Sequence, residues 1–111
     1  MNRSPAYLYV LTALGGGPLH GLGIAEAVST FTRGSVVLGP GTLYRCLADL
    51  DEDGLIRRTE APPGEGGGGR KFYELTDGGR AELGEAIDEL TRLVAAAGRG
   101  LRGDDPIGAS T

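Results

Sequence analysis

Five residues between positions 49 and 60 have the spacing of a calcium-binding loop. Three alternating acids precede a glycine, and a glutamate closes the pattern: Asp49, Asp51, Asp53, Gly54 and Glu60. A calcium loop needs a helix leaving it at the last ligand, yet Ala61 is followed by Pro62-Pro63-Gly64, which excludes one. We therefore interpret the match as a coincidence across a helix–strand junction and expect no calcium site.

A glycine-rich segment suggests a second chemistry, a loop that cradles nucleotide phosphates. It reads GEGGGGRKF from Gly64 to Phe72. A phosphate loop requires a lysine followed by serine or threonine, but Arg70 takes the lysine position and Phe72 follows Lys71. The flanking residues predict strands on both sides, whereas a phosphate loop joins a strand to a helix. We expect no nucleotide site here.

Catalytic and metal-binding chemistry has few candidate side chains. The chain has one histidine, His20, and one cysteine, Cys46, so it lacks the ligands of a four-coordinate zinc site. Cys46 adjoins the apolar Leu47, which favours a structural thiol over a nucleophile. His20 opens a predicted helix, where its ring can face a phosphate or a backbone group; we favour the structural role. We expect no enzyme, no metal and no cofactor.

The composition fits one small domain of 111 residues with a formal net charge of −4. This charge excludes a global basic field, although a local basic stripe is what contacts DNA phosphates. The single cysteine permits no internal disulfide, as in a reducing cytoplasm, and no segment reaches the about 18 apolar residues of a membrane span. We therefore expect a cytoplasmic protein without a membrane partner.

The elements that must position these side chains follow from hydrophobic periodicity and from breaker residues. The pattern predicts helices over residues 6–14, 21–31, 41–53 and 77–97, a brief strand over 35–38, and strands over 55–60 and 70–76 around a mobile tip. Residues 98–111 are rich in glycine and charge, which predicts a disordered tail. Three helices followed by a hairpin make a winged helix-turn-helix. The expected fold is mainly α with a small β-hairpin wing: residues 1–76 form this domain and 77–97 a long C-terminal dimerisation helix.

Three segments carry a resemblance to a known family. LTALGGGPLHGLGI (11–24), GPGTLYRCLADLDEDGLI (39–56) and RKFYELTDGGRAEL (70–83) resemble, in order, the PadR family of bacterial transcriptional regulators, in its subgroup with one C-terminal helix. The resemblance implies a dimeric winged-helix DNA-binding protein, usually a repressor, that can lose DNA affinity on binding a small aromatic or lipophilic effector. Ala48 and Asp49 stand where the family often has lysine or arginine, so the third helix is less basic.

Candidate DNA contacts lie at three places in this frame. The N-terminal turn of a recognition helix enters the major groove, and the residues expected there are Gly41, Thr42, Tyr44 and Arg45. Arg70 and Lys71 beside the wing tip are expected to contact phosphate, as is His20 if its ring faces outward. Tyr44 could instead pack against the hairpin. Arg57 and Arg58 could contact phosphate or pair with Glu60 or Glu74.

The first and fourth helices carry more apolar surface than a three-helix core can cover. We expect them to form a two-fold dimer interface made by Tyr7, Leu8, Leu11, Leu83, Ile87, Leu90 and Val94. The operator would then be an inverted repeat of double-stranded DNA. An effector pocket could use Tyr7, Tyr9, Leu11, Ile87 and Leu90. The alternatives are that the fourth helix packs on its own core, and that the chain is a winged-helix protein-interaction module without DNA binding.

Overall fold

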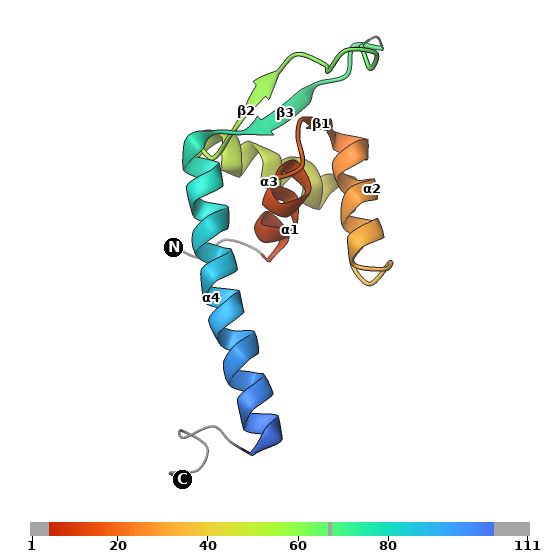
Figure 1. Cartoon of the computed structure of the whole chain (residues 1–111). Coiled ribbons are helices and arrows are strands. Elements are labelled where there is room, and N and C mark those ends of the chain that lie inside the picture. Colours follow the sequence, from red (N-terminus) through yellow and green to blue (C-terminus); the bar gives the residue numbers. More distant parts are fainter. Residues whose placement is uncertain (1–4, 67, 104–111) are drawn as a thin grey trace.

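The computed structural model describes residues 5–66 and 68–103. Figure 1 shows a small helical body, a hairpin that projects from one end, and a long helix that runs away from the hairpin. The elements in chain order are α1 (Ala6–Leu14), β1 (Leu19–His20), α2 (Gly21–Phe31), α3 (Pro40–Glu52), β2 (Ile56–Thr59), β3 (Phe72–Leu75) and α4 (Asp77–Arg102). The mainly α fold with a hairpin wing is confirmed.

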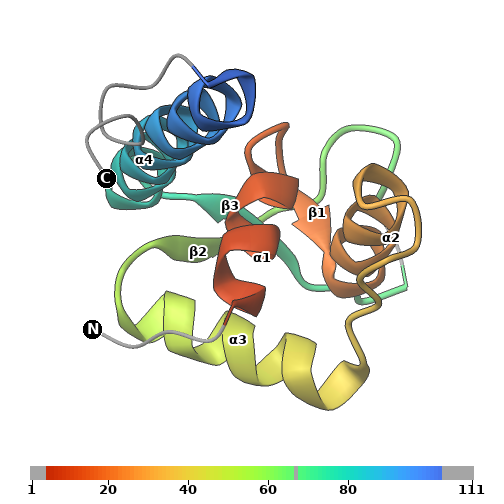
Figure 2. The ribbon, with the colours of Figure 1, turned by 90° about the horizontal axis from the view of Figure 1, so that it is seen from below.

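Helix α1 forms the centre of the body because nearly every side of it is apolar. In Figure 2 it lies among α2, α3 and the sheet, with α4 beside it. Its residues Val10, Leu11 and Leu14 are at most 1% exposed. An apolar helix without a polar face is one covered on several sides. One prediction fails as a result: Leu11 is fully buried in its own chain, so it cannot line a dimer interface or an effector pocket.

Helix α3 lies against this core through a single stripe. Leu43, Leu47 and Leu50 are buried at i, i+4 and i+7, as expected. The helix ends at Glu52, and Gly54, with a left-handed φ of +76°, turns the chain away from it. The Leu55 amide then donates to the Leu50 carbonyl oxygen at 2.9 Å. The calcium-like pattern therefore spans the last turns of α3, a glycine cap and β2, and forms no loop.

The sheet has three strands in the order β1-β3-β2, all antiparallel. The predicted strand over residues 35–38 is wrong: this segment is the irregular connection between α2 and α3, and Val37 is 77% exposed. β-Branched residues do not make a strand without an edge to pair with. The edge of β3 is taken instead by β1, where Leu19 faces Tyr73 and His20 faces Phe72 in the register.

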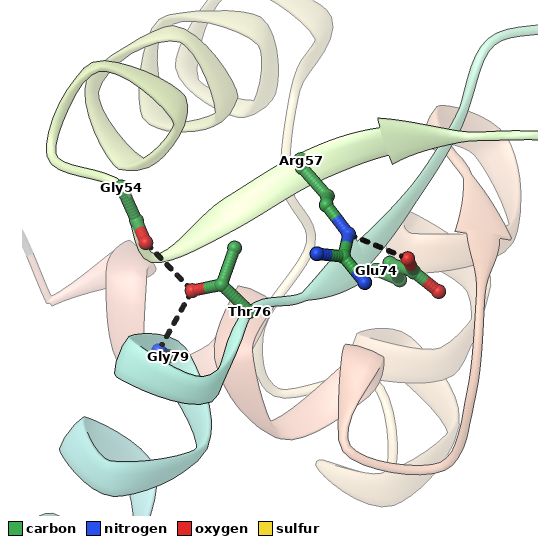
Figure 3. Close-up of polar contacts among 5 residues, drawn as sticks. All are labelled: Gly54, Arg57, Glu74, Thr76 and Gly79. Atoms are coloured by element: carbon green, nitrogen blue, oxygen red, sulfur yellow. Dashed lines mark hydrogen bonds and ion pairs between the residues drawn. The ribbon is translucent and has the colours of Figure 1, made fainter.

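Helix α4 starts at a side-chain cap that also ties it to the wing. The Thr76 hydroxyl accepts from the Gly79 amide at 3.0 Å and donates to the Gly54 carbonyl at 2.6 Å, as Figure 3 shows. The helix continues to Arg102, five residues beyond the predicted end at Ala97, so residues 98–102 are not part of a tail. The disorder predicted for residues 104–111 lies outside the described residues.

The long α4 makes the chain elongated, with extents of 59 × 28 × 26 Å. Only Gly79 of this helix is buried. Its apolar side chains past the first turns are largely exposed: Ile87 54%, Leu90 44%, Leu93 62%, Val94 68% and Leu101 91%. Within the described residues, no helix has the length and apolar character needed to cross a bilayer.

Candidate nucleic-acid interface

The N-terminal turn of α3 presents its polar residues on one exposed face. Gly41, Thr42, Arg45 and Asp49 line a shallow hollow of about 430 Å³. Thr42, Arg45 and Asp49 follow the i, i+3, i+7 spacing of one helix face, since the leucines occupy the opposite face. A hydroxyl and a guanidinium at this turn can bond to base edges or phosphates. The helical period already puts Asp49 on the face of Arg45, and in the structure it lines the same hollow.

Tyr44 is held in place by a glycine of the neighbouring helix. Its side chain is 56% exposed, and its hydroxyl lies over Gly21 at the start of α2. A Cβ added at Gly21 would stand 2.7 Å from that hydroxyl oxygen, closer than van der Waals contact allows. Tyr44 therefore leans on α2 and keeps its hydroxyl near the surface. Sequence reasoning missed the role of Gly21.

His20 has the structural role that the sequence favoured and also faces the wing. Its Nδ1 accepts from the Gly23 amide at 3.1 Å and so caps α2. Its ring meets Phe72 edge-on at a centroid distance of 5.2 Å, and its Nε2 lies 3.2 Å from Nη1 of Arg70. The strand register causes this meeting, because His20 faces Phe72, two residues from Arg70.

These side chains surround a second hollow between α2 and the wing. It has a volume of about 410 Å³ and is lined by His20, Gly21, Leu22, Tyr44, Gly69, Arg70, Lys71 and Tyr73. Neighbouring residues Tyr44 and Arg45 line one hollow each, so the two hollows adjoin along α3. The structure thus brings all seven predicted DNA-binding residues to one surface. Leu22 also lines the second hollow and is 58% exposed. The hydrophobic periodicity of α2 did not predict this exposed position.

The first wing strand contributes less to this surface. Arg57 bonds through Nε to a Glu74 carboxylate oxygen at 2.7 Å, and the two residues are direct cross-strand partners (Figure 3). Of the two readings left open for Arg57, the structure supports the ion pair. Its side chain is 64% exposed, so the pair contributes well under about 1 kcal/mol to stability. Arg58 is exposed on the same strand.

Cys46 has the environment of an inert thiol. It is 6% exposed in the core, where burial first, and the Asp49 carboxylate second, raise its pKa from 9.0 to about 11. A nucleophilic cysteine requires the opposite shift, toward the thiolate. The expectation of a structural cysteine fits this surrounding.

We expect the Cys46 thiol to make the fold sensitive to alkali. The folded pKa is raised, so the thiol's contribution to stability is complete below pH 9 and is lost as the pH rises towards 11. Urea unfolding between pH 7 and pH 10.5 measures this, with Cys46→Ala as the control that lacks the titrating group. The wild-type protein should lose more stability over this range than the variant. Equal losses would contradict the burial effect.

The residues predicted for a dimer interface, apart from the buried Leu11, lie along α1 and α4. Tyr7 and Leu8 of α1 are half-buried and line a groove of about 640 Å³ with Leu90, Leu93 and other residues of α4. Leu83 packs on the core, and Ile87 and Val94 are exposed on the same helix. Tyr9, expected near an effector, instead stacks on Phe31 of α2 at 6.5 Å.

Sequence comparison identifies relatives over most of the chain. The family model described as the Transcriptional regulator PadR-like family matches residues 10–85. The transcriptional regulator Rv3488 of Mycobacterium tuberculosis is 33% identical over 96 residues, which cover 84% of this chain and 85% of that protein. An uncharacterised 37.1 kDa protein in a transposon of Streptomyces fradiae is 37% identical over 93 residues. The match covers 84% of this chain but a quarter (25%) of the Streptomyces protein.

Solved structures share the fold. A PadR family transcription regulator from Clostridium difficile superposes with a TM-score of 0.73 at 23% identity, over 88% of this chain and 99% of that chain. Bacillus subtilis PadR in complex with operator DNA gives a TM-score of 0.62 at 24% identity, over 75% of this chain and 46% of that chain. The family match and the mycobacterial relative show that this chain belongs to the PadR-like family of transcriptional regulators, a family of regulators and not of enzymes.

Proposed function

We propose that the protein is a homodimeric transcriptional repressor in the cytoplasm that binds an inverted-repeat operator. The observation that supports this proposal is one surface formed by α3, the N-terminus of α2 and the wing. Hydrogen-bond donors from all three elements lie on it. A chain of net charge −4 has no global attraction for DNA, so this local grouping is what can contact it. The Bacillus relative, solved with operator DNA, supports the same use of the fold.

The orientation of α3 suits entry into the major groove. Its N-terminal turn carries Thr42 and Arg45, whereas the acids Asp51, Glu52 and Asp53 lie at its C-terminal end. Arg45 can make a two-pronged contact to guanine, and Thr42 can bond to a base or a phosphate. Arg70 and Lys71 on the wing would then follow the backbone or reach the minor groove. These three acids would lie outside the groove, whereas Asp49 lines the same hollow as Arg45.

The dimer is proposed on the apolar surface of α4. Four apolar side chains of α4 beside the groove at α1 are 44–68% exposed, and a soluble monomer rarely leaves such a group open: Ile87, Leu90, Leu93 and Val94. A two-fold axis through this face would place two α3 helices on successive major grooves, roughly 34–36 Å apart. Each half of an inverted repeat would meet one subunit.

Replacing Leu93 with glutamate is expected to convert the dimer to a monomer without unfolding it. The side chain is 62% exposed in the single chain, so the change leaves the core intact but places charge in the proposed interface. Light scattering coupled to size exclusion measures the mass, and circular dichroism measures the helix content. Val37→Glu, at a position 77% exposed in the α2–α3 connection, is the matched control and should keep the wild-type mass. An unchanged mass for Leu93→Glu would place the interface elsewhere.

Selection from a random duplex library, repeated at several salt concentrations, tests the proposed function. A repressor of this kind should enrich an inverted repeat, and its affinity should fall steeply with salt because phosphate contacts release counterions. If no duplex binds better than random DNA, the chain is instead the winged-helix protein-interaction module. Transcription from a promoter that contains the enriched repeat then shows whether occupancy blocks polymerase.

A small aromatic or lipophilic effector would act through the dimer surface. The groove of about 640 Å³ between α1 and α4 offers Tyr7, Leu8 and Leu90 as apolar contacts. A ligand there would change the packing of α4 and thereby the spacing of the two α3 helices. Operator binding measured with and without small aromatic compounds tests this step.

A further inference from the structure

Two nitrogen atoms that face each other beneath the wing have no common acceptor among the described residues. His20 Nδ1 accepts the Gly23 amide hydrogen at 3.1 Å, so in the neutral ring the hydrogen sits on Nε2. Nε2 lies 3.2 Å from Nη1 of Arg70, and a guanidinium only donates. The hydrogen on Nε2 and the hydrogens on Nη1 therefore point into the same space, and residues 5–66 and 68–103 place no acceptor between them.

The alternative tautomer does not remove this conflict. A ring with its hydrogen on Nδ1 could accept from Arg70, but it would leave the Gly23 amide without its cap at the start of α2. A doubly protonated ring would lose that cap as well and would set a second positive charge against Arg70. The ring is also held in direction by its edge contact with Phe72. The arrangement that keeps the cap is the one with two converging donors.

We propose that the hollow beneath the wing is a phosphate-binding site, with His20 Nε2–H and Arg70 as donors that share one phosphate oxygen. The inference rests on the proposed function in that the DNA backbone is the source of phosphate we favour. The other residues that line this hollow also suit a phosphate. Lys71 adds a second positive charge, and the Tyr44 hydroxyl lies over Gly21 at the rim. The N-terminus of α2 adds its favourable dipole.

This site would do a different task from that of α3. One donor comes from the start of α2 and another from the wing, so a phosphate held between them would fix the wing relative to the helix-turn-helix. Such a contact positions the protein on DNA and carries no base preference. The hollow does not suit an apolar ligand, because the charged side chains of Arg70 and Lys71 line it.

Asparagine at position 20 separates the two tasks of the histidine. Its side-chain oxygen can cap α2 from the same extended backbone, but its amide is too short to reach the position of Nε2. His20→Asn should keep the wild-type melting temperature and lower operator affinity about tenfold, which matches the loss of one hydrogen bond to a charged group. The salt dependence should stay the same because a neutral ring releases no counterion. Arg70→Gln should lower both the affinity and the salt slope, the latter by about 0.9.

Nitrogen-15 spectra of the His20 ring test the tautomer and the source of the phosphate without relying on affinity. The free protein should show hydrogen on Nε2. A shift of that resonance with operator DNA alone assigns the site to the backbone, and a saturable shift with inorganic phosphate alone assigns it to a free anion. A hydrogen on Nδ1, or no shift with either, would overturn the proposal. Where operator DNA produces the shift, wild-type operator affinity in His20→Asn would overturn it as well. If the library yields no operator while phosphate shifts the ring, the proposed function fails and this site stands.

Discussion

Gly79→Ala is expected to lower the stability of the protein by about 3 kcal/mol, the cost of forcing an atom into a packed site. An added Cβ at Gly79 would overlap the carbonyl oxygen of Leu55, a backbone atom that already accepts the Thr76 amide at 3.1 Å. The first turn of α4 would have to move away from the α3–β2 junction. The Thr76 bonds to Gly54 and Gly79 in Figure 3 would break with it.

The neighbouring glycine supplies the matched control. A Cβ at Gly78 would meet the Gly54 carbonyl oxygen at 3.5 Å, an ordinary contact. Gly78→Ala should therefore stabilise the protein by up to about 1 kcal/mol, because alanine favours the helix over glycine. Thermal unfolding distinguishes the two, with a drop of roughly 15 °C expected for Gly79→Ala and a small rise for Gly78→Ala. Equal melting temperatures would show that α4 does not start against Leu55.

Arg45→Ala is expected to weaken binding to the selected operator by about 2 kcal/mol, roughly 30-fold. Arg45 stands on the exposed face of α3 in the hollow with Thr42, where a guanidinium can contact guanine with two hydrogen bonds. The loss should fall on one base pair of each half-site, whose sequence preference would relax. The fold of the Arg45→Ala variant should be unaffected because the Arg45 side chain is exposed.

Arg99→Ala provides a charge-matched control for that measurement. Arg99 lies in the last turns of α4, at the end of the molecule opposite the wing in Figure 1, and removal of its charge should leave affinity within about twofold. Fluorescence anisotropy with the operator and with single-base variants measures both affinity and preference. If Arg45→Ala retains full affinity and preference, α3 does not read the bases through this residue.

Asp49 places a negative charge on the proposed DNA surface. Its carboxylate lines the same hollow as Arg45, one turn further along α3. A carboxylate near the backbone opposes phosphate, whereas one at a base edge can accept from cytosine. The net charge of −4 and this acid both make nonspecific attraction weak. Specific contacts must therefore supply a large share of the binding free energy.

The periodic helices and the wing strands could be predicted from the sequence, because their cause is local. The predicted ranges of α1 and α2 match the structure, and the leucine stripe of α3 is buried as expected. β1 could not be predicted, since two residues carry no period and this strand exists only through its pairing with β3. The mistaken strand over residues 35–38 failed for the same reason, since local β propensity makes a strand only where the segment pairs with another strand, and this segment pairs with none of the described strands.

By itself, the sequence determined the residue types at the proposed DNA surface, the start of α2 at His20 and the apolar excess on α4. Only the tertiary structure decided which of these residues meet. It placed Leu11 inside the core, set Tyr44 over Gly21 and paired Arg57 with Glu74. It also brought His20 to Arg70, 50 positions away. Local patterns record the period of each element, whereas contacts between elements depend on register and packing, which no single segment encodes.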